Sequence, residues 1–229
     1  MLRRLLDAVH ADPYRNLLRD HTLARIAKLF SPRYLRSKAA LVAFETLHPD
    51  LPWFTRDAIE KLERWLRPTF RGLEWGSGRS SQWLASRSAS LVSVEHNPLW
   101  YERVRASLAA AGITNVDYRL QPEDDYVRVV DEFADRRFDY VVVDGLFRSE
   151  TLLRSMRKLR AGGWIVFDNA NWYLRSASRT PHSLPLDGPP ASPGFERAER
   201  EIAAWRATWT TNGVNDTLIL VKPEATPVG

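Results

Sequence analysis

Hydrophobic and polar positions repeat with two different periods along the chain. Up to residue 66, apolar residues recur every three or four positions, which predicts helices within "LLRDHTLARIAKLF", "SPRYLRSKAALVAFETL" and "TRDAIEKLERWL". From residue 67 onward, short apolar segments rich in β-branched and aromatic residues replace this pattern and predict strands. These segments are 70–75, 91–96, 116–120, 138–145 and 162–169.

Helical segments separate the predicted strands, at 79–87, 98–111, 123–134 and 149–159. Such alternation predicts an α/β fold with a parallel sheet, right-handed crossovers and helices on both faces. After a further helix near 194–206, "WRATWTTNGV" and "DTLILVKP" surround an Asn212-Gly213 turn and predict an antiparallel pair. We therefore expect a doubly wound, seven-stranded, mostly parallel sheet with a C-terminal antiparallel hairpin and an N-terminal helical extension.

The change of period divides the chain into two parts. Residues 1–66 form a helical segment that we expect to cover the substrate or to take part in oligomerisation, and residues 67–229 form the core. Within the core, residues 171–195 are rich in Pro, Gly and Ser and predict a long loop. Loops of this length are usually functional lids or disordered, so this loop is a candidate lid.

Composition limits the kind of protein. Hydrophobic residues make up 44% of the 229 positions and charged residues 27%, as in a globular protein with a sizeable core. Without cysteine there is neither a disulfide framework nor a thiolate nucleophile. Charged and polar residues interrupt the apolar N-terminus, so we expect no secretory signal, no membrane span and a cytoplasmic location.

The basic charge lies at one end of the sequence. Residues 1–40 contain nine Lys or Arg and three Asp, a charge of +6, which leaves −1 for the other residues within the total of +5. A solvated helix face explains this excess, as does an anionic substrate, a nucleic acid or an acidic membrane surface.

The stretch "GLEWGSGRSSQWLA" (72–85) predicts a ligand-binding turn between a strand and a helix. Glycines allow a ligand to approach the backbone, and the helix N-terminus offers unpaired N–H groups. A dinucleotide fingerprint would place a third glycine where Ser81 stands. Glu74, just before the turn, would repel a pyrophosphate and attract a cation. These two residues favour S-adenosylmethionine (SAM), which carries an ammonium and a sulfonium, over a dinucleotide.

The series "LEWGSGRSS", "VSVEHNPLWYERV", "FDYVVVDG" and "GGWIVFDN" resembles, in order and spacing, the class I SAM-dependent methyltransferases over roughly residues 68–222. The predicted terminal hairpin agrees with that family. The resemblance implies a methionine site at the glycine turn, a ribose-binding carboxylate at Glu95, and adenosine contacts beyond it, with Glu123 or Asp124 facing the adenine. The implied cofactor residues are Glu74, Gly76, Ser77, Gly78, Ser80, Ser81, Glu95, His96, Asn97, Glu123 and Asp144.

The fourth and fifth strands end in oxygen-bearing residues. Asp144, Asp168 and Asn169 would meet at one edge of the sheet and suit Mg²⁺ or another divalent cation. This pattern resembles the metal site of catechol-type O-methyltransferases, which commonly have a lysine base just after the first aspartate. Here Phe147 and Arg148 follow instead, and arginine stays protonated, so it can clamp an anion but is no ordinary base. Alternatively, Asp144 contacts SAM or substrate while Asp168 and Asn169 hydrogen-bond the loop.

Three residues of the predicted loop are further candidates. His182 is either a base delivered by a closing lid or simply exposed. Trp172 and Tyr173 either line the site of an aromatic or apolar acceptor or pack under the loop. The candidate catalytic set is therefore Asp144, Arg148 and His182.

These features predict methyl transfer from SAM to a small molecule or peptide, most readily at oxygen. The sequence has "DGLF" where nucleobase amino-methyltransferases often carry an Asn/Asp-Pro-Pro-aromatic motif, which disfavours a nucleobase amine. An RNA-directed methyltransferase and a non-catalytic domain that binds SAM or a nucleotide are the alternatives. The resemblance also implies a possible homodimer through the N-terminal helices.

Overall fold

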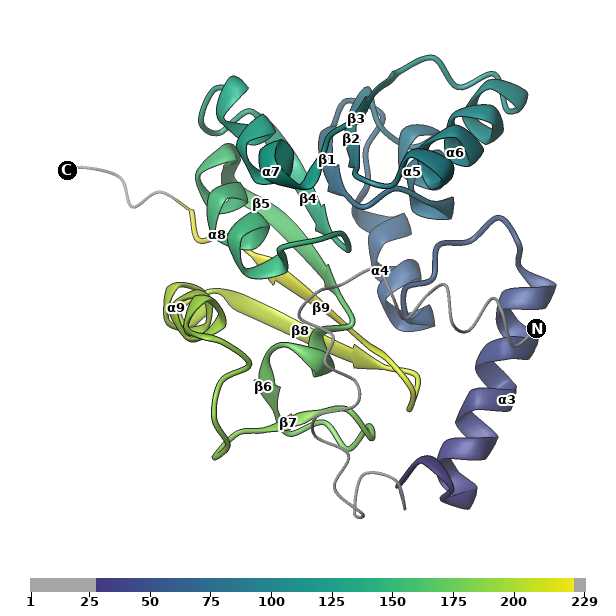
Figure 1. The fold of residues 1–229 in the computed structure, drawn as a ribbon, viewed down its shortest axis with the longest axis vertical. Coiled ribbons are helices and arrows are strands. Elements are labelled where there is room, and N and C mark those ends of the chain that lie inside the picture. The colour runs from purple at the N-terminus through teal and green to yellow at the C-terminus, as the bar shows by residue number, and fades with distance from the viewer. Residues whose placement is uncertain (1–27, 225–229) are drawn as a thin grey trace.

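The computed structural model describes residues 28–224, which form a seven-stranded sheet between layers of helices (Figure 1). The strands are β1 (Arg71–Trp75), β2 (Ser90–Glu95), β3 (Val116–Leu120), β4 (Phe138–Val143), β5 (Leu159–Asp168), β8 (Arg206–Thr211) and β9 (Asp216–Val221). Their order is β3-β2-β1-β4-β5-β9-β8, with the first five parallel and β9 antiparallel to both neighbours. The predicted fold class is confirmed.

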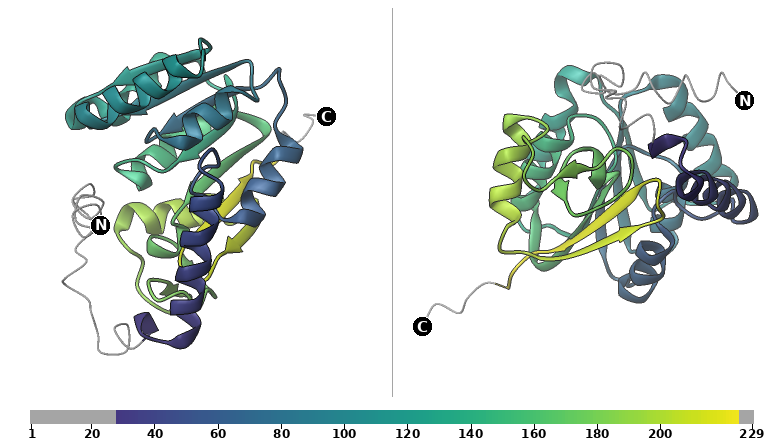
Figure 2. Two further views of the ribbon diagram at one scale, coloured as in Figure 1. Left: turned by 90° about the vertical axis from the view of Figure 1, so that its right-hand side faces the viewer. Right: turned by 90° about the horizontal axis from the view of Figure 1, so that it is seen from below.

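Helices cover both faces of the sheet (Figure 2). Their bounds are α3 (Pro32–Leu47), α4 (Arg56–Trp65), α5 (Arg79–Ala85), α6 (Pro98–Ala110), α7 (Glu123–Tyr126), α8 (Arg148–Lys158) and α9 (Pro193–Ile202), with 3₁₀ turns η1 (Val127–Glu132) and η2 (Ala170–Trp172). The α7–η1 segment, α8 and α9 pack on one face, and α4 and α5 on the other. The α6 helix contacts β2, β3 and α5.

Strand residues alternate between the two cores because successive side chains point to opposite faces. Trp75 is fully buried on the α8 side, where its indole Nε1 donates to Ser155 Oγ at 2.9 Å. On the other face Tyr140 stacks on Trp164 with ring centroids 4.8 Å apart. Trp75 and Tyr140 thus fill the two cores, and their hydrogen-bonding and stacking contacts fix the orientation of the side chains.

The helix predicted over 123–134 is wrong in its extent. A single α-helical turn, α7, is followed by the 3₁₀ turn η1. The β-branched Val127, Val129 and Val130 have low helix propensity. Val129 and Val130 are buried against the sheet. The strand predicted to begin at 162 begins at Leu159 instead.

The predicted loop 171–195 is a folded segment. It contains two two-residue strands, β6 (Arg175–Ser176) and β7 (Leu184–Pro185), which pair in parallel. Arg175 fixes it to α9, because its Nη2 lies 2.6 Å from Glu199 Oε2 and its backbone N–H donates to Glu199 Oε1 at 2.8 Å. The segment follows β5 directly and therefore lies at the carboxyl edge of the parallel strands (Figure 1).

The N-terminal extension lies along one side of the sheet. The α4 helix buries Ala58, Ile59 and Leu62, whereas α3 has one buried residue, Leu41. The first predicted helix, within residues 17–30, falls mostly outside the described residues. Of the helices in residues 28–224, none has the length and apolar character needed to cross a membrane.

A buried threonine joins this extension to the sheet. Thr217 Oγ1, in β9, accepts the backbone N–H of Thr55 at 3.0 Å and donates to Asp168 Oδ1 at 2.7 Å. Thr55 and Thr217 are at most 1% exposed. One hydroxyl thus links the start of α4, β9 and the end of β5.

We expect Thr217→Val to lower the free energy of unfolding by about 2–4 kcal/mol, because it leaves the buried N–H of Thr55 without its acceptor and removes a hydroxyl donor from the buried Asp168 carboxyl. Thr208→Val is the matched control, since Thr208 lies half-buried on β8 with no hydroxyl hydrogen bond to the described residues. Urea denaturation of the two variants measures the difference. Equal stability of the two variants would show that the Thr217 hydroxyl is dispensable.

Candidate active site

Two glycines build the turn between β1 and α5, each in a different way. Gly76 has φ +84°, and a Cβ there would lie 2.7 Å from backbone atoms of Gly145, so that only glycine fits between the ends of β1 and β4. Gly78 is extended, and the nearest described atom to an added Cβ would be Ser80 Oγ, at 3.9 Å. Among residues 28–224, nothing crowds Gly78, as close approach of a ligand to the backbone requires.

Glu74 lies below this turn and is fully buried. Its Oε2 accepts hydrogen bonds from Ser81 Oγ at 2.5 Å and Ser93 Oγ at 2.6 Å, while Oε1 has no partner among the described residues. Burial raises the pKa of Glu74 to about 7, against the effect of the hydroxyl groups. Ser81 Oγ also accepts the N–H of Gly78 at 3.0 Å, so it connects the carboxyl group to the turn.

Glu95 is the last residue of β2, and its carboxylate accepts several hydrogen bonds. Its Oε2 accepts the N–H and the hydroxyl of Ser77, at 3.1 and 3.0 Å, and its Oε1 accepts the N–H groups of His96 and Asn97, both at 2.9 Å. Burial acts to raise the pKa of Glu95, but the His96 side chain, whose Nδ1 lies 3.1 Å from Oε1, and the N–H groups of Asn97 and Ser77 outweigh it and hold the pKa below its usual value. Glu95 is therefore an ionised acceptor beside the glycine turn.

Two aromatic residues that the sequence did not single out hold the middle of the turn. Trp100 Nε1 donates to Ser77 O at 2.7 Å, and the Tyr118 hydroxyl lies 2.6 Å from Ser77 Oγ. Tyr118 in turn stacks on Tyr101 with centroids 4.3 Å apart. Trp100 occupies the third position of α6, after the Asn97 cap. Its place in the first turn of the helix after the second strand could have indicated that it lies near the glycine turn. Nothing in the sequence around Tyr118 indicated its contact.

The α7 helix also places a residue that the sequence did not single out, Tyr126, under the end of β4. Glu123 and Asp124 are exposed in its first turn, and their contact with an adenine stays a prediction. Tyr126 is fully buried and its hydroxyl donates to Val94 O at 3.3 Å. A Cβ on Gly145 would meet that hydroxyl, so Tyr126 packs directly under the end of β4.

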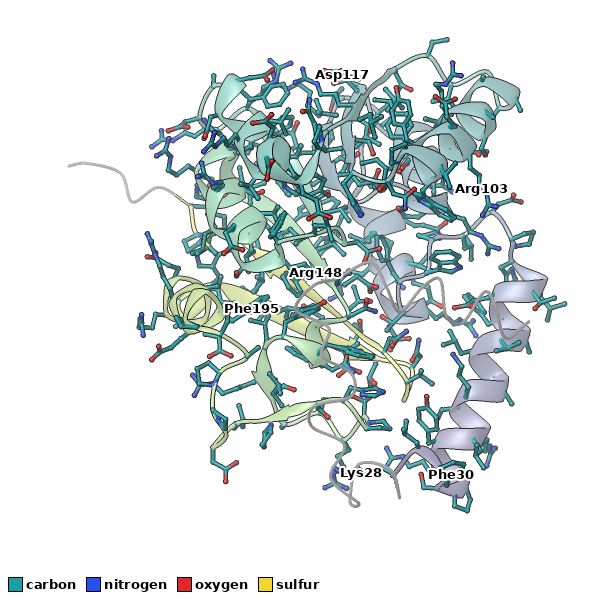
Figure 3. The ribbon with its side chains drawn as sticks, in the orientation of Figure 1. Lys28, Phe30, Arg103, Asp117, Arg148 and Phe195 are labelled. Atoms are coloured by element: carbon teal, nitrogen blue, oxygen red, sulfur yellow. The ribbon has the colours of Figure 1, made fainter. Side chains whose placement is uncertain are left out.

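Asp144, Asp168 and Asn169 come together at the ends of β4 and β5, and the guanidinium of Arg148 lies among them. Figure 3 marks the place of Arg148 in the molecule. Its Nη2 donates to Asp144 O and Oδ1, both at 2.8 Å. Its Nη1 donates to Asp168 O at 2.5 Å and faces Asn169 Oδ1 at 3.5 Å, and its Nε donates to Gly145 O at 3.1 Å. An arginine has five N–H donors, and these five contacts match that number.

This arrangement does not fit a magnesium site. The oxygens of Asp144 and Asn169 that would bind a cation already face a positive charge. The Asp168 carboxyl accepts a hydrogen bond from Thr217, and burial together with the charge of Asp144 raises its pKa to about 8. Within residues 28–224 there is also no group of three or more His, Cys, Asp or Glu that can hold a metal.

The three loop residues make aromatic contacts, with Tyr173 buried and Trp172 and His182 half-buried. Tyr173 is buried against Phe167 and Phe195, with centroids 6.0 and 5.1 Å away. His182 stacks on Trp172 at 4.0 Å with the rings 19° apart. Of the two readings of Tyr173, the geometry favours packing, whereas a base role for His182 stays a prediction.

Comparison with known proteins agrees with this geometry. Residues 73–170, somewhat less than half of the chain, match the family model described as a methyltransferase domain. This part of the chain is a methyltransferase domain. SAM is the methyl donor of its class, and the methyltransferase fold of the class I enzymes is the one described above. A search of the curated proteins gave no match.

Solved structures share the fold of the methyltransferase at low sequence identity. The O-methyltransferase TomG of Streptomyces achromogenes, involved in tomaymycin synthesis and solved with SAM, is 23% identical (TM-score 0.55), with 81% of this chain and 90% of that chain covered. A methyltransferase from Geobacter sulfurreducens is 14% identical (TM-score 0.52; 89% and 97% covered). An rRNA methylase from Streptococcus thermophilus is 12% identical (TM-score 0.50; 72% and 93% covered).

The two glycines of the turn lead to opposite expectations. Gly76→Ala should destabilise the methyltransferase by more than about 2 kcal/mol, because a positive φ and the backbone of Gly145 both oppose a side chain. Gly78→Ala should leave stability within about 1 kcal/mol but weaken SAM binding at least tenfold, since its methyl group projects into the open space of the turn. Thermal unfolding and calorimetric titration with SAM separate these effects. Undiminished SAM affinity in Gly78→Ala would place the cofactor elsewhere.

Glu74 should make the stability of the methyltransferase fall as pH rises. Its pKa is about 7 in the folded state, against the ordinary value of 4.5 for a solvated glutamate, so between these values the folded protein holds one extra proton. The contribution of Glu74 protonation to the free energy of unfolding is fully present below pH 4.5 and is lost by about pH 7. The difference is at most about 3 kcal/mol. Glu74→Gln should remove it.

Urea denaturation at about pH 5 and about pH 7.5 measures this contribution in both proteins. The loss between the two pH values should be larger in the wild-type protein than in Glu74→Gln by about 2–3 kcal/mol. The other titrating groups, including Asp168, are common to both proteins and cancel in this comparison. An identical pH dependence would mean that Glu74 is ionised in the folded protein at neutral pH.

Proposed function

We propose that the chain transfers the methyl group of SAM to an oxygen atom of a small molecule or peptide. The observation that carries the proposal is the position of Asp144. Its backbone N–H donates to Trp75 O at 2.9 Å, and its carbonyl carbon would lie 2.9 Å from a Cβ on Gly76, so it adjoins the glycine turn. Its side chain is 27% exposed, which leaves it accessible to an acceptor.

The cofactor would lie along the carboxyl ends of β1 and β2. The Gly76–Gly78 turn would receive the methionine part, with Ser77, Ser80 and Ser81 around it. The ionised Glu95 would accept the ribose hydroxyls. The oxygens of Glu95 already accept hydrogen bonds from the protein. When the ribose binds, the Ser77 hydroxyl would therefore leave Glu95 Oε2 or share this oxygen with a ribose hydroxyl. His96 and Asn97 would contact the adenosine.

Methyl transfer is an in-line displacement, so the protein mainly aligns the acceptor and receives its proton. SAM supplies a methyl group on a sulfonium, and the acceptor oxygen displaces the sulfur, which keeps the bonding electron pair. Asp144 would accept the hydroxyl proton of the acceptor as the new O–C bond forms. Its orientation is fixed by Arg148, at 2.8 Å, so the base is positioned before the acceptor arrives.

A small acceptor agrees with the shape of the carboxyl edge. The loop 171–195 is fixed here by three kinds of contact: the Arg175–Glu199 ion pair, the Trp172–His182 stack and a hydrogen bond from Asn171 Nδ2 to Thr180 Oγ1 at 2.9 Å. Tyr173 of this loop lies against Arg148, the partner of Asp144, so the folded loop would narrow access to the site. TomG, which has the same fold, is an O-methyltransferase. The lid role of the loop, a homodimer and a cytoplasmic location remain predictions.

An RNA acceptor is the second candidate, and α3 provides the observation in its favour. Arg33, Arg36 and Lys38 are exposed on this helix, and Lys28 just before it is exposed as well. Such a surface attracts a polyanion, with an affinity that falls steeply as salt rises. The rRNA methylase from Streptococcus thermophilus shares the fold.

Asp144→Asn tests the proposal, since it keeps an oxygen for Arg148 but cannot take a proton. We expect kcat to fall by about 10²–10⁴ with the Kd of SAM changed less than threefold. Asp187→Asn, exposed in the loop after β7, is the matched control and should be fully active.

The measurement uses SAM with a labelled methyl group and a panel of phenols, carboxylic acids, amines, peptides and RNA. Fragmentation of the product by mass spectrometry identifies the methylated atom. Label in RNA alone, lost as salt is raised, would replace this proposal by the second candidate. Label on nitrogen would overturn the assignment to oxygen.

A further inference from the structure

The guanidinium of Arg148 fills the space that the three oxygen-bearing side chains enclose. Its side chain is 9% exposed, and its Cζ lies 5.1 Å from the centroid of the Tyr173 ring, which covers one of its faces. The partners come from two loops: Asp144 and Gly145 after β4, and the end of β5. A single cation thus joins the carboxyl ends of two neighbouring strands.

The partners of Arg148 are mostly fixed backbone atoms. Three of its contacts are carbonyl oxygens, those of Asp144, Gly145 and Asp168, and the ion pair with the Asp144 carboxylate is added to them. A planar guanidinium makes such contacts in one orientation, because its donors form a rigid fork. Arg148 is held in this place and is unlike an exposed ion pair between two flexible side chains.

The side chains that would have to bind a divalent cation already have partners within the protein. Asp144 Oδ1 and Asn169 Oδ1 face the guanidinium, at 2.8 and 3.5 Å. The Asp168 carboxyl is directed to β9, where its Oδ1 accepts the hydroxyl of Thr217 at 2.7 Å. A divalent cation in this space would meet a nearby positive charge in a partly desolvated environment, which is strongly repulsive.

We propose that Arg148 is a built-in cation in the place of a metal ion, and that methyl transfer by this chain needs no divalent cation. This inference rests on the proposed function for its catalytic consequence. Arg148 is then a positioning residue, because its donors are engaged within the protein and its charge acts on the acceptor through Asp144. It holds the Asp144 carboxylate beside the glycine turn in the orientation that proton transfer requires.

The position of Arg148 in the sequence explains how this replacement arises. It begins α8, four residues after Asp144, so the first turn of the helix brings its side chain back over the end of β4. Phe147, just before it, has φ +48° and ends the loop sharply, which directs the next residue toward β5. Where the catechol-type O-methyltransferases commonly have a lysine, this chain has Phe147, at which the backbone turns, followed by Arg148.

The test is a titration of the full chain with Mn²⁺, followed by the loss of the electron paramagnetic resonance signal of the free ion. Wild-type protein should show no stoichiometric binding of Mn²⁺ at concentrations up to about 1 mM. Any binding would then have a Kd above about 1 mM, which corresponds to a binding free energy weaker than about 4 kcal/mol. Arg148→Ala removes the guanidinium that faces Asp144 Oδ1 and Asn169 Oδ1, so this variant should bind one Mn²⁺ at least tenfold more tightly than the wild-type protein. Arg154→Ala, on the exposed side of the same helix, is the matched control and should behave as wild type.

Arg148→Lys separates charge from geometry and covers the case in which Arg148→Ala does not fold. Lysine keeps the positive charge, so it should still exclude Mn²⁺, but it cannot make the five contacts. We therefore expect kcat to fall at least tenfold with an unchanged Kd for SAM. Full activity of this variant would contradict the positioning role.

The Mn²⁺ titration needs no acceptor, so its outcome is independent of which atom is methylated. One Mn²⁺ bound by the wild-type protein, with activity lost on adding a chelator, would overturn the inference and leave the proposed function intact. Absence of Mn²⁺ binding by folded Arg148→Ala would also overturn it, since the guanidinium would then not occupy a cation site. Activity that is insensitive to chelator, together with a gained site in Arg148→Ala, would support it.

Discussion

The close contact of two backbone turns determines the geometry of the whole site. The turn after β1 and the turn after β4 approach each other at Gly76 and Gly145, where either glycine would clash with the other chain segment if it carried a Cβ. A hydrogen bond from Asp144 N to Trp75 O, at 2.9 Å, joins the two turns, and one from Gly76 N to Val94 O, also at 2.9 Å, attaches the first turn to β2. Because of this contact, the open turn proposed to receive the cofactor and the carboxylate proposed as base are neighbours. Parallel strands alone would place them at the same edge but not in contact.

Around this contact, two buried glutamates have opposite electrostatic roles. Glu74 is given two hydroxyl donors on one oxygen and none among the described residues on the other, so desolvation dominates and raises its pKa. Glu95 accepts three backbone N–H groups besides a hydroxyl, and its pKa is lowered in spite of its burial. Burial is similar, so the number and kind of donors decides the difference. A negative charge is thus kept at Glu95, beside the turn, and suppressed at Glu74, below it.

The sequence predicted the fold well because periodicity and strand ends are local properties. Alternation of strands and helices, the Asn212-Gly213 hairpin and the placement of Asp144, Asp168 and Asn169 at one edge all follow from short stretches of residues. The extent of the α7–η1 segment could not be predicted in this way, because the packing of Val129 and Val130 against the sheet decides it. Trp100 and Tyr118 were missed for a related reason. Their contacts with Ser77 depend on how α6 and β3 are placed on the sheet, which no local pattern reveals.

Arg148 shows most clearly where local reasoning stops. From the sequence, an arginine after "DGLF" was a possible clamp for an anionic substrate, because arginine is a good donor to carboxylates and phosphates. In the folded chain its donors are directed inward, to carbonyl oxygens of the loop after β4 and of the last residue of β5, and to the Asp144 carboxylate. The sequence correctly indicates a permanent cation at this position. The partners of this cation, however, lie at the ends of β4 and β5, and α8 separates these two strands in the sequence. What such a cation does is therefore decided by the topology of the sheet, since only the adjacency of β4 and β5 brings its partners together.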